Sequence, residues 1–101
     1  MTYNLKYDVP APVEMYDAAH SAIKELIGDT DIGLIVHVGY PTDQGFGIVE
    51  VWESRDSFDK FITDVWPRAA AKIHLGDRES PHAQAFEIHG LFVAATKGIY
   101  I

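Results

Sequence analysis

The sequence predicts one α+β domain, residues 1–101, with the ferredoxin-like order strand, helix, strand, strand, helix, strand. A length of 101 residues corresponds to a single domain. Apolar residues alternate with other residues in four segments and recur at three- and four-residue steps in two others. Only turn residues separate the two middle strands, which indicates a hairpin. We therefore expect an antiparallel four-stranded sheet with two helices on one face.

The first half of the chain supplies a strand and a helix. Residues 2–9 alternate, and Pro10 ends that strand pattern. Pro12 suits the first turn of a helix, and Gly28 is a typical C-terminal stop. Between them, one apolar stripe follows helical spacing: Val13, Tyr16, His20, Ile23 and Ile27.

The middle of the chain predicts a hairpin followed by a helix. Residues 32–40 and 47–53 are rich in β-branched and aromatic residues, with turn residues between them. Ser54 is a good N-cap for the helix that follows. Pro67 falls inside this helix and removes a backbone hydrogen bond, so we expect a kink near Asp64 or a break.

The last part of the chain contains a polar loop at residues 76–82, a strand at 83–92 and an apolar tail at 93–101. With this strand the sheet has four members. Because two helices can cover only one face of such a sheet, the other face must be either polar or covered by a partner.

Alternation sorts the hairpin residues into two sides. One side is purely aliphatic (Ile32, Leu34, Val36, Val38, Val49 and Val51), and the other is mixed (Ile35, His37, Ile48, Glu50 and Trp52). We assign the aliphatic side to the helices, which leaves the mixed side facing outward. An exposed face with tryptophan and isoleucine usually marks an interaction surface. This pattern predicts that a second copy covers the face in a twofold homodimer.

Several short runs resemble one protein superfamily. They are residues 36–42, 45–46, 49–54 and 58–61, together with Pro67. These runs look like the dimeric α+β barrel superfamily, which includes antibiotic-biosynthesis monooxygenase-like and stress-responsive A/B-barrel proteins. The resemblance covers nearly the whole chain and implies a homodimer with a small-molecule cavity. Known members include cofactor-free monooxygenases, haem-degrading enzymes, lactone isomerases and polyketide cyclases, so the resemblance carries over no single substrate.

Composition excludes several partners. The formal net charge is −7, without a basic cluster, so nucleic acid would be repelled. The absence of cysteine excludes disulfides and thiolate metal sites. No apolar run approaches the roughly 20 residues of a membrane span, and the start does not resemble a signal peptide. We expect a cytoplasmic protein that does not bind membranes.

The strongest candidate site consists of His37, Glu50 and Trp52. A symmetric hairpin places His37 opposite or diagonal to Glu50. A carboxylate beside an imidazole fixes the ring tautomer and raises its basicity, as a general base requires. Trp52 would then offer an aromatic floor to a flat substrate. The alternative is a structural His–Glu hydrogen bond that satisfies two buried polar groups.

Three further residues are weaker candidates for substrate binding. His89, in the last predicted strand, would face the barrel, and with His37 and Glu50 it has the residue types of an iron site. No ligand pair at helical or hairpin spacing supports that site, so we expect no metal. His20 lies on the helix stripe, and Tyr7 lies on the first strand, where packing is the alternative role for each.

Two classes of function fit these observations. The first is a cofactor-independent monooxygenase, isomerase or cyclase acting on a small apolar or aromatic substrate, with His37 as base and Glu50 orienting it. The second is a non-catalytic homodimer that binds a small apolar ligand or another protein. The two differ in whether the His37–Glu50 pair is open to a ligand or sealed by side chains.

Overall fold

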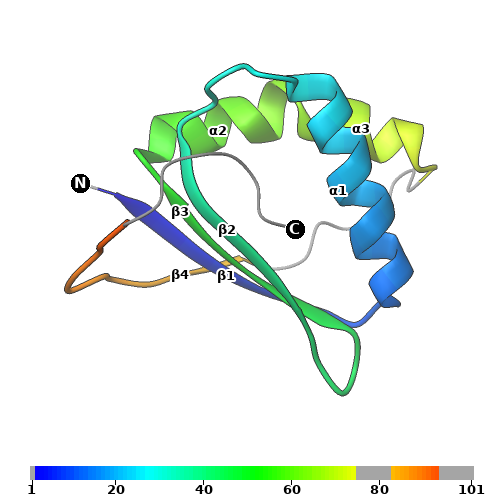
Figure 1. Cartoon of the computed structure of the whole chain (residues 1–101), viewed down its shortest axis with the longest axis horizontal. Coiled ribbons are helices and arrows are strands. Elements are labelled where there is room, and N and C mark those ends of the chain that lie inside the picture. The colour runs from blue at the N-terminus through cyan, green and yellow to red at the C-terminus, as the bar shows by residue number, and fades with distance from the viewer. Residues whose placement is uncertain (1, 75–82, 94–101) are drawn as a thin grey trace.

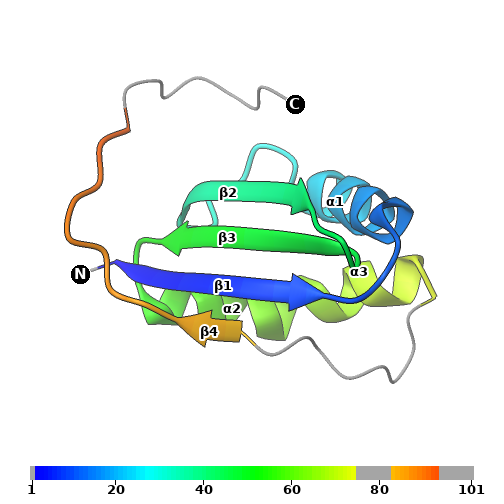
Figure 2. The same cartoon turned by 90° about the horizontal axis from the view of Figure 1, so that it is seen from below.

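The computed structural model describes residues 2–74 and 83–93. Its elements are β1 (Tyr3–Val9), α1 (Val13–Ile27), β2 (Leu34–Pro41), β3 (Phe46–Trp52), α2 (Arg55–Asp64), α3 (Trp66–Lys72) and β4 (Ala83–Ala85). The strands form one antiparallel sheet in the order β2-β3-β1-β4. The helices lie on one face of this sheet (Figures 1 and 2). The predicted ferredoxin-like α+β class is therefore confirmed.

The local signals around the helices act as predicted. Helix α1 ends at Ile27, and Gly28 follows it with a positive φ of 54°. Ser54 caps α2 by accepting a hydrogen bond from the backbone N–H of Ser57 at 3.1 Å. The predicted long second helix breaks at Val65, between α2 and α3. Pro67 occupies the first turn of α3, where its missing N–H costs no intrahelical bond.

The last strand is shorter than the pattern predicted. Strand β4 covers only Ala83–Ala85, and residues 86–93 continue without regular secondary structure. The prediction of a strand to residue 92 is wrong because pairing with β1 stops after Leu5↔Ala85, one step before Asn4. At that position the Phe86 backbone N–H still donates to the Asn4 carbonyl, and the Asn4 side chain donates to the carbonyl of Phe86, both at 3.1 Å. The predicted polar loop lies outside the described residues, as does the apolar tail beyond Val93.

The two faces of the sheet are the reverse of the sequence assignment. Trp52 packs on Phe58 and Phe61 of α2, with ring centroids 5.7 and 5.3 Å apart, and its exposed fraction is 0%. Leu5, on the same face of β1, is also buried. The mixed side of the hairpin therefore faces the helices. The aliphatic side, with Val36, Val38, Val49 and Val51, lies on the opposite face, and Val38 is 48% exposed.

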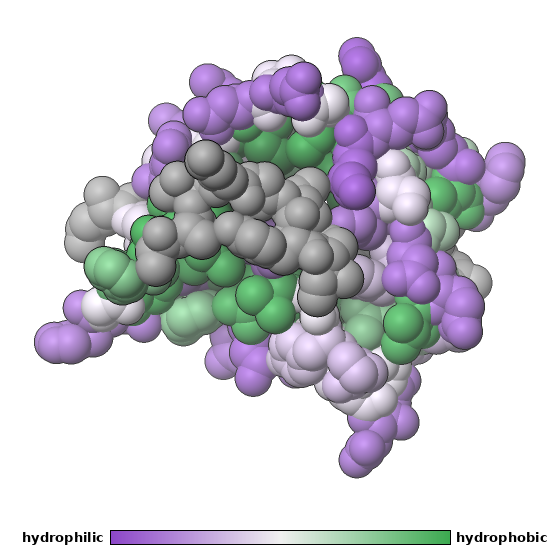
Figure 3. Space-filling view, viewed as in Figure 1, coloured by the Kyte–Doolittle hydropathy of each residue, from purple (hydrophilic) through white to green (hydrophobic). Residues whose placement is uncertain are grey.

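A physical reason for this reversal lies in size. Large rings of the helices and of the sheet meet on this face, because Tyr16 lies 5.5 Å from Phe46 and Phe61 lies 5.3 Å from Trp52 between ring centroids. A β-bulge between Leu34 and Val36 also places Leu34 opposite Trp52, which breaks the simple alternation along β2. Figure 3 shows hydrophilic residues on the outside of the helices and hydrophobic residues nearer the sheet. The valine face, on which Val38 is exposed, Val36 and Val49 are half-buried and Val51 is buried, is called the open face below.

No helix in the described ranges is long and apolar enough to cross a lipid bilayer.

Candidate functional site

A carboxylate and an imidazole meet where β2 and β3 pair. His37 and Glu50 are direct partners in the antiparallel register, so both side chains lie on the helix-covered face. The His37 Nδ1 atom lies 2.9 Å from Glu50 Oε2. The two side chains are 23% and 11% exposed. The pairing predicted from the hairpin is present, but it faces the helices and not an outer surface.

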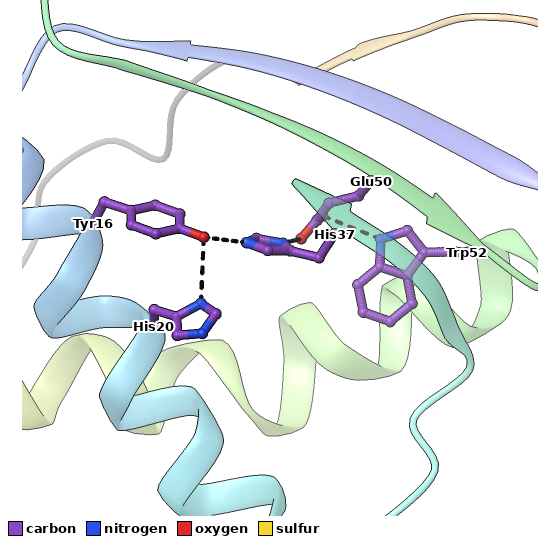
Figure 4. A network of polar contacts seen from close by, with 5 residues as sticks. All are labelled: Tyr16, His20, His37, Glu50 and Trp52. Carbon is purple, nitrogen blue, oxygen red and sulfur yellow. Dashed lines mark hydrogen bonds and ion pairs between the residues drawn. The ribbon is translucent and has the colours of Figure 1, made fainter. Parts of the chain in front are cut away.

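Helix α1 adds two more groups to this pair. Tyr16 and His20 lie four residues apart, on the side of the helix that faces the sheet. The Tyr16 hydroxyl lies 2.9 Å from His37 Nε2 and 3.3 Å from His20 Nδ1. The Tyr16 ring stacks on the His37 ring at 5.9 Å. Figure 4 shows the resulting chain of contacts, in which the phenol joins the two imidazoles.

Trp52 lies at the other end of this series of hydrogen bonds. Its indole N–H donates to Glu50 Oε1 at 3.1 Å, and this contact is buried. The indole ring contacts Phe58 and Phe61 of α2, and the residue is 0% exposed. In this arrangement the Trp52 ring offers no surface to a ligand. It fixes the second oxygen of Glu50, and so the orientation of the carboxylate. The five residues Tyr16, His20, His37, Glu50 and Trp52 are called the relay cluster.

Electrostatics differ between the cluster's phenol and its outer imidazole. Burial raises the pKa of Tyr16, and the charges of Asp17 and Glu50 raise it further. Burial lowers the pKa of His20, as do His37 and Lys24, against a smaller opposite effect of Asp17. At neutral pH the phenol is therefore protonated and His20 is uncharged. The uncharged phenol and the uncharged imidazole can each donate one hydrogen and accept another, so they can join a series of neutral hydrogen bonds.

Gly39 gives the Tyr16 ring its place over β2. A Cβ atom at Gly39 would lie 2.4 Å from Tyr16 Cζ and 2.5 Å from its hydroxyl oxygen. Real side chains do not approach so closely, so any larger residue here would displace the phenol. Gly39 follows His37 by two residues on the same face of β2. The absence of a side chain at Gly39 therefore leaves room for the Tyr16 ring, whose hydroxyl contacts His37.

The two remaining predicted site residues, Tyr7 and His89, lie outside the relay cluster. Tyr7 lies on the same face of the sheet, and burial together with the charge of Glu50 raises its pKa strongly. His89 is exposed in the single chain and belongs to no strand, so the strand expected to carry it does not reach it. In the described ranges, no group of three or more His, Asp or Glu residues is arranged to hold a metal ion. His37, Glu50 and His89 are thus not brought together.

Sequence reasoning missed the roles of Tyr16 and Gly39. The signal for Tyr16 was the four-residue step to His20 on one apolar helix stripe, which makes two polar rings neighbours. Gly39 had no comparable signal, because only the position of α1 explains it.

One hollow on the described part of the chain lies away from the relay cluster. It is a cavity of about 330 Å³ lined by Glu53, Ser57 and Phe61 with residues of the loop before β2 and of α2. None of the relay cluster lines it. The cluster is instead reached through its half-buried members Tyr16, His20 and His37.

Comparison with known proteins shows similarity in structure and not in sequence. No family model and no curated protein matches the sequence. Among solved structures, SnoaB, a cofactor-independent oxygenase from Streptomyces nogalater, superposes with a TM-score of 0.59 at 12% identity, over 89% of this chain and 93% of that chain. An antibiotic biosynthesis monooxygenase gives 0.56 at 18% identity, over 89% of this chain and all (100%) of that chain.

A third structure agrees with these two. Rv0793 from Mycobacterium tuberculosis gives a TM-score of 0.54 at 13% identity, over 93% of this chain and 97% of that chain. At such identities the similarity establishes the fold. The chain therefore has the ferredoxin-like α+β fold of the antibiotic-biosynthesis-monooxygenase-like proteins, as its resemblance to that superfamily predicted.

Proposed function

We propose that this chain is a small-molecule enzyme that needs no bound cofactor and uses the Glu50–His37 pair as its acid–base group. The observation that carries the proposal is the hydrogen-bond chain from Glu50 through His37 to the Tyr16 hydroxyl, with both links at 2.9 Å. A carboxylate that orients an imidazole, which in turn contacts a hydroxyl, is the arrangement used to move protons in general acid–base catalysis.

The chemistry that suits the hydrogen-bond series Glu50–His37–Tyr16 is the removal of a proton from a weakly acidic substrate. The imidazole gains a positive charge when it accepts the proton, and the adjacent carboxylate stabilises that charge. The substrate anion is electron-rich, and isomerisation, cyclisation and oxygenation can each begin from such an anion. The aromatic surroundings of the cluster, which include Phe46 at 5.5 Å from Tyr16, favour a small apolar or aromatic substrate.

The structural neighbours support this reaction class. SnoaB is described as a cofactor-independent oxygenase, and one other neighbour is named an antibiotic biosynthesis monooxygenase. Their fold accommodates chemistry of this kind, although fold alone does not transfer a reaction. The acid–base assignment for this chain rests on its own side chains.

The proposed enzyme is a homodimer. The open face carries Val36, Val38 and Val49, which water would hydrate at a cost, and a second copy would remove them from water. Because a twofold interface uses the same patch on both copies, one flat apolar face is sufficient. This interface replaces the one inferred from sequence, in which Ile48 and Trp52 made the contact.

One observation favours the alternative of a non-catalytic ligand-binding homodimer. Both ring nitrogens of His37 already have protein partners, Glu50 and Tyr16. A histidine satisfied on both sides is also what a purely structural network contains. The two functions differ in one outcome: a catalyst changes its ligand, whereas a binding protein returns it unchanged.

The decisive experiment is a screen of hydroxylated aromatic compounds of one to three rings by thermal shift, followed by turnover assays on the hits. Oxygen consumption identifies an oxygenase, and product formation without it identifies an isomerase or cyclase. We expect His37→Ala and Glu50→Gln to abolish turnover while the fold survives. His89→Ala, an exposed imidazole outside the cluster, is the matched control and should keep full activity. Unchanged turnover in His37→Ala would refute the proposal, and binding without turnover would establish the alternative.

A further inference from the structure

We propose that His20, through its Nε2 atom, is the group that takes the proton from the substrate, and that Tyr16 passes the charge inward to the His37–Glu50 pair. This inference rests on the proposed acid–base function and names the atom at which it begins. It changes the role of His20 from a lining residue to a catalytic one. It also makes Tyr16 a positioning and relay residue.

The assignment follows from counting hydrogens along the cluster. The indole of Trp52 can only donate, so Glu50 Oε1 accepts, and an ionised Glu50 also accepts through Oε2. His37 Nδ1 must then carry a hydrogen, which leaves only a lone pair on Nε2 of the neutral ring. The Tyr16 hydroxyl fills that site by donating its single hydrogen.

The same count of hydrogens continues to His20, the last residue of the hydrogen-bond series. Having donated, the Tyr16 oxygen can only accept, so the hydrogen between it and His20 must come from His20 Nδ1, 3.3 Å away. A neutral imidazole carries one hydrogen. His20 Nε2 is therefore left with a bare lone pair. This assignment gives every other donor and acceptor atom of the hydrogen-bond chain a partner, and each of its hydrogen bonds points toward Glu50.

The position of His20 suits a proton acceptor. In Figure 4 its second ring nitrogen points away from Tyr16 and out of the cluster. That nitrogen has no hydrogen-bond partner among the described residues, whereas His37 uses both of its nitrogens. Burial and the neighbouring His37 and Lys24 lower the pKa of His20, so its free lone pair is present at neutral pH. His20 is also half exposed, so a ligand can reach it.

The proton transfer balances in three linked steps. The substrate's X–H bond breaks and its proton forms a new bond to His20 Nε2. The hydrogen on His20 Nδ1 moves to the Tyr16 oxygen, and the original Tyr16 hydrogen moves to His37 Nε2. The products are the substrate anion, neutral His20, neutral Tyr16 and a His37 imidazolium beside the Glu50 carboxylate. The total charge is −1 before and after, because the new positive charge and the substrate's negative charge cancel.

The destination of the charge has an electrostatic reason. An imidazolium at His37 lies 2.9 Å from a carboxylate oxygen, whereas one at His20 would lie near Lys24 and near His37 itself. The other charged group that acts on His20 is Asp17, whose effect is smaller than those of burial, His37 and Lys24. The relay thus couples an accessible lone pair to the place where the positive charge is best stabilised.

The first test measures tautomers and needs no substrate. Two-bond proton–nitrogen NMR correlations on the whole protein at pH 7 distinguish an imidazole with hydrogen on Nδ1 from one with hydrogen on Nε2. We expect the Nδ1–H form at both His20 and His37, and its loss at His20 in Tyr16→Phe. The exposed His74 and His89 serve as internal controls, because isolated imidazoles favour the Nε2–H form. A His20 ring with its hydrogen on Nε2 in the unaltered protein would overturn the inference.

The second test measures reactivity at the free nitrogen. Diethyl pyrocarbonate acylates unprotonated imidazole nitrogens, and peptide mass spectrometry locates the product. We expect His20 to react at least tenfold faster than His37, and Tyr16→Phe to reduce that difference. Faster labelling of His37 than of His20 would contradict the assignment. These results stand apart from the proposed function, since a chain with no substrate can still show the predicted tautomers, and an active enzyme can lack them.

Discussion

The indole N–H of Trp52 donates to Glu50 Oε1 at 3.1 Å, so a fully buried ring holds one oxygen of the carboxylate whose other oxygen faces His37. Trp52→Phe removes this donor and leaves a buried carboxylate oxygen without a partner. We expect a loss of about 1–3 kcal/mol in the free energy of unfolding for the unpaired oxygen, with a further loss for the smaller ring.

Urea unfolding measures this loss, and the chain offers a matched control. Trp66 is half-buried at the start of α3 and has no side-chain hydrogen bond among the described residues. Trp66→Phe should therefore cost clearly less than Trp52→Phe. Equal losses in the two variants would mean that the hydrogen bond to Glu50 contributes nothing measurable.

Replacing Gly39 by alanine tests how the phenol is positioned. The added Cβ would lie 2.4 Å from Tyr16 Cζ, so the ring must move away from His37. We expect turnover to fall and the His20 tautomer to change, with a stability loss of about 1–3 kcal/mol from overpacking. Gly90→Ala is the control, because nothing lies within 4 Å of a Cβ there. Unaltered His20 and His37 NMR signals in Gly39→Ala would show that the ring finds the same contact elsewhere.

The homodimer is tested on the open face. Light scattering after size exclusion should give about twice the mass of one chain. Val38→Asp places a carboxylate on a residue that is 48% exposed in the single chain, and its burial in an interface would be costly. We expect that variant to run as a monomer. Ile62→Asp, on α2 at 39% exposure, is the control and should remain dimeric. A monomeric unaltered protein at micromolar concentration would exclude the dimer.

The lowered pKa of His20 predicts how stability depends on pH. Burial is the main cause, so the unfolded chain binds a proton at His20 more readily than the folded protein does. Stability is then lost as the pH falls from the ordinary pKa of 6.5 toward the lower folded value. Thermal melts across this interval should show a shallower decline for His20→Gln than for the unaltered protein. An identical decline in both proteins would assign the effect to other groups.

The cap of α2 contributes to the stability of the site from a distance. Ser54 accepts the backbone N–H of Ser57 at 3.1 Å, and α2 carries the aromatic rings that cover Trp52. Ser54→Ala should cost about 1 kcal/mol, which is a fall in Tm of about 4–8 °C for a domain of this size. Ser21→Ala, on the exposed side of α1, should leave Tm nearly unchanged. A Tm for Ser54→Ala equal to that of the control would mean that water replaces the cap.

The sequence by itself determined the order of the elements and the contact between His37 and Glu50. Both depend on local rules, because alternation and turn residues fix which residues of a hairpin are opposite. It also located the helix break, since Pro67 acts on its own turn.

Only the tertiary structure decided which side of the sheet the helices cover. Alternation separates the two sides of a strand without saying which is inside, and the valine side and the ring-bearing side both looked apolar enough. The decision came from the fit of Trp52 against α2 and from the bulge before Val36. The same packing brought Tyr16 to His37, 21 residues away along the chain. No local pattern encodes that contact, because it depends on where α1 lies over β2.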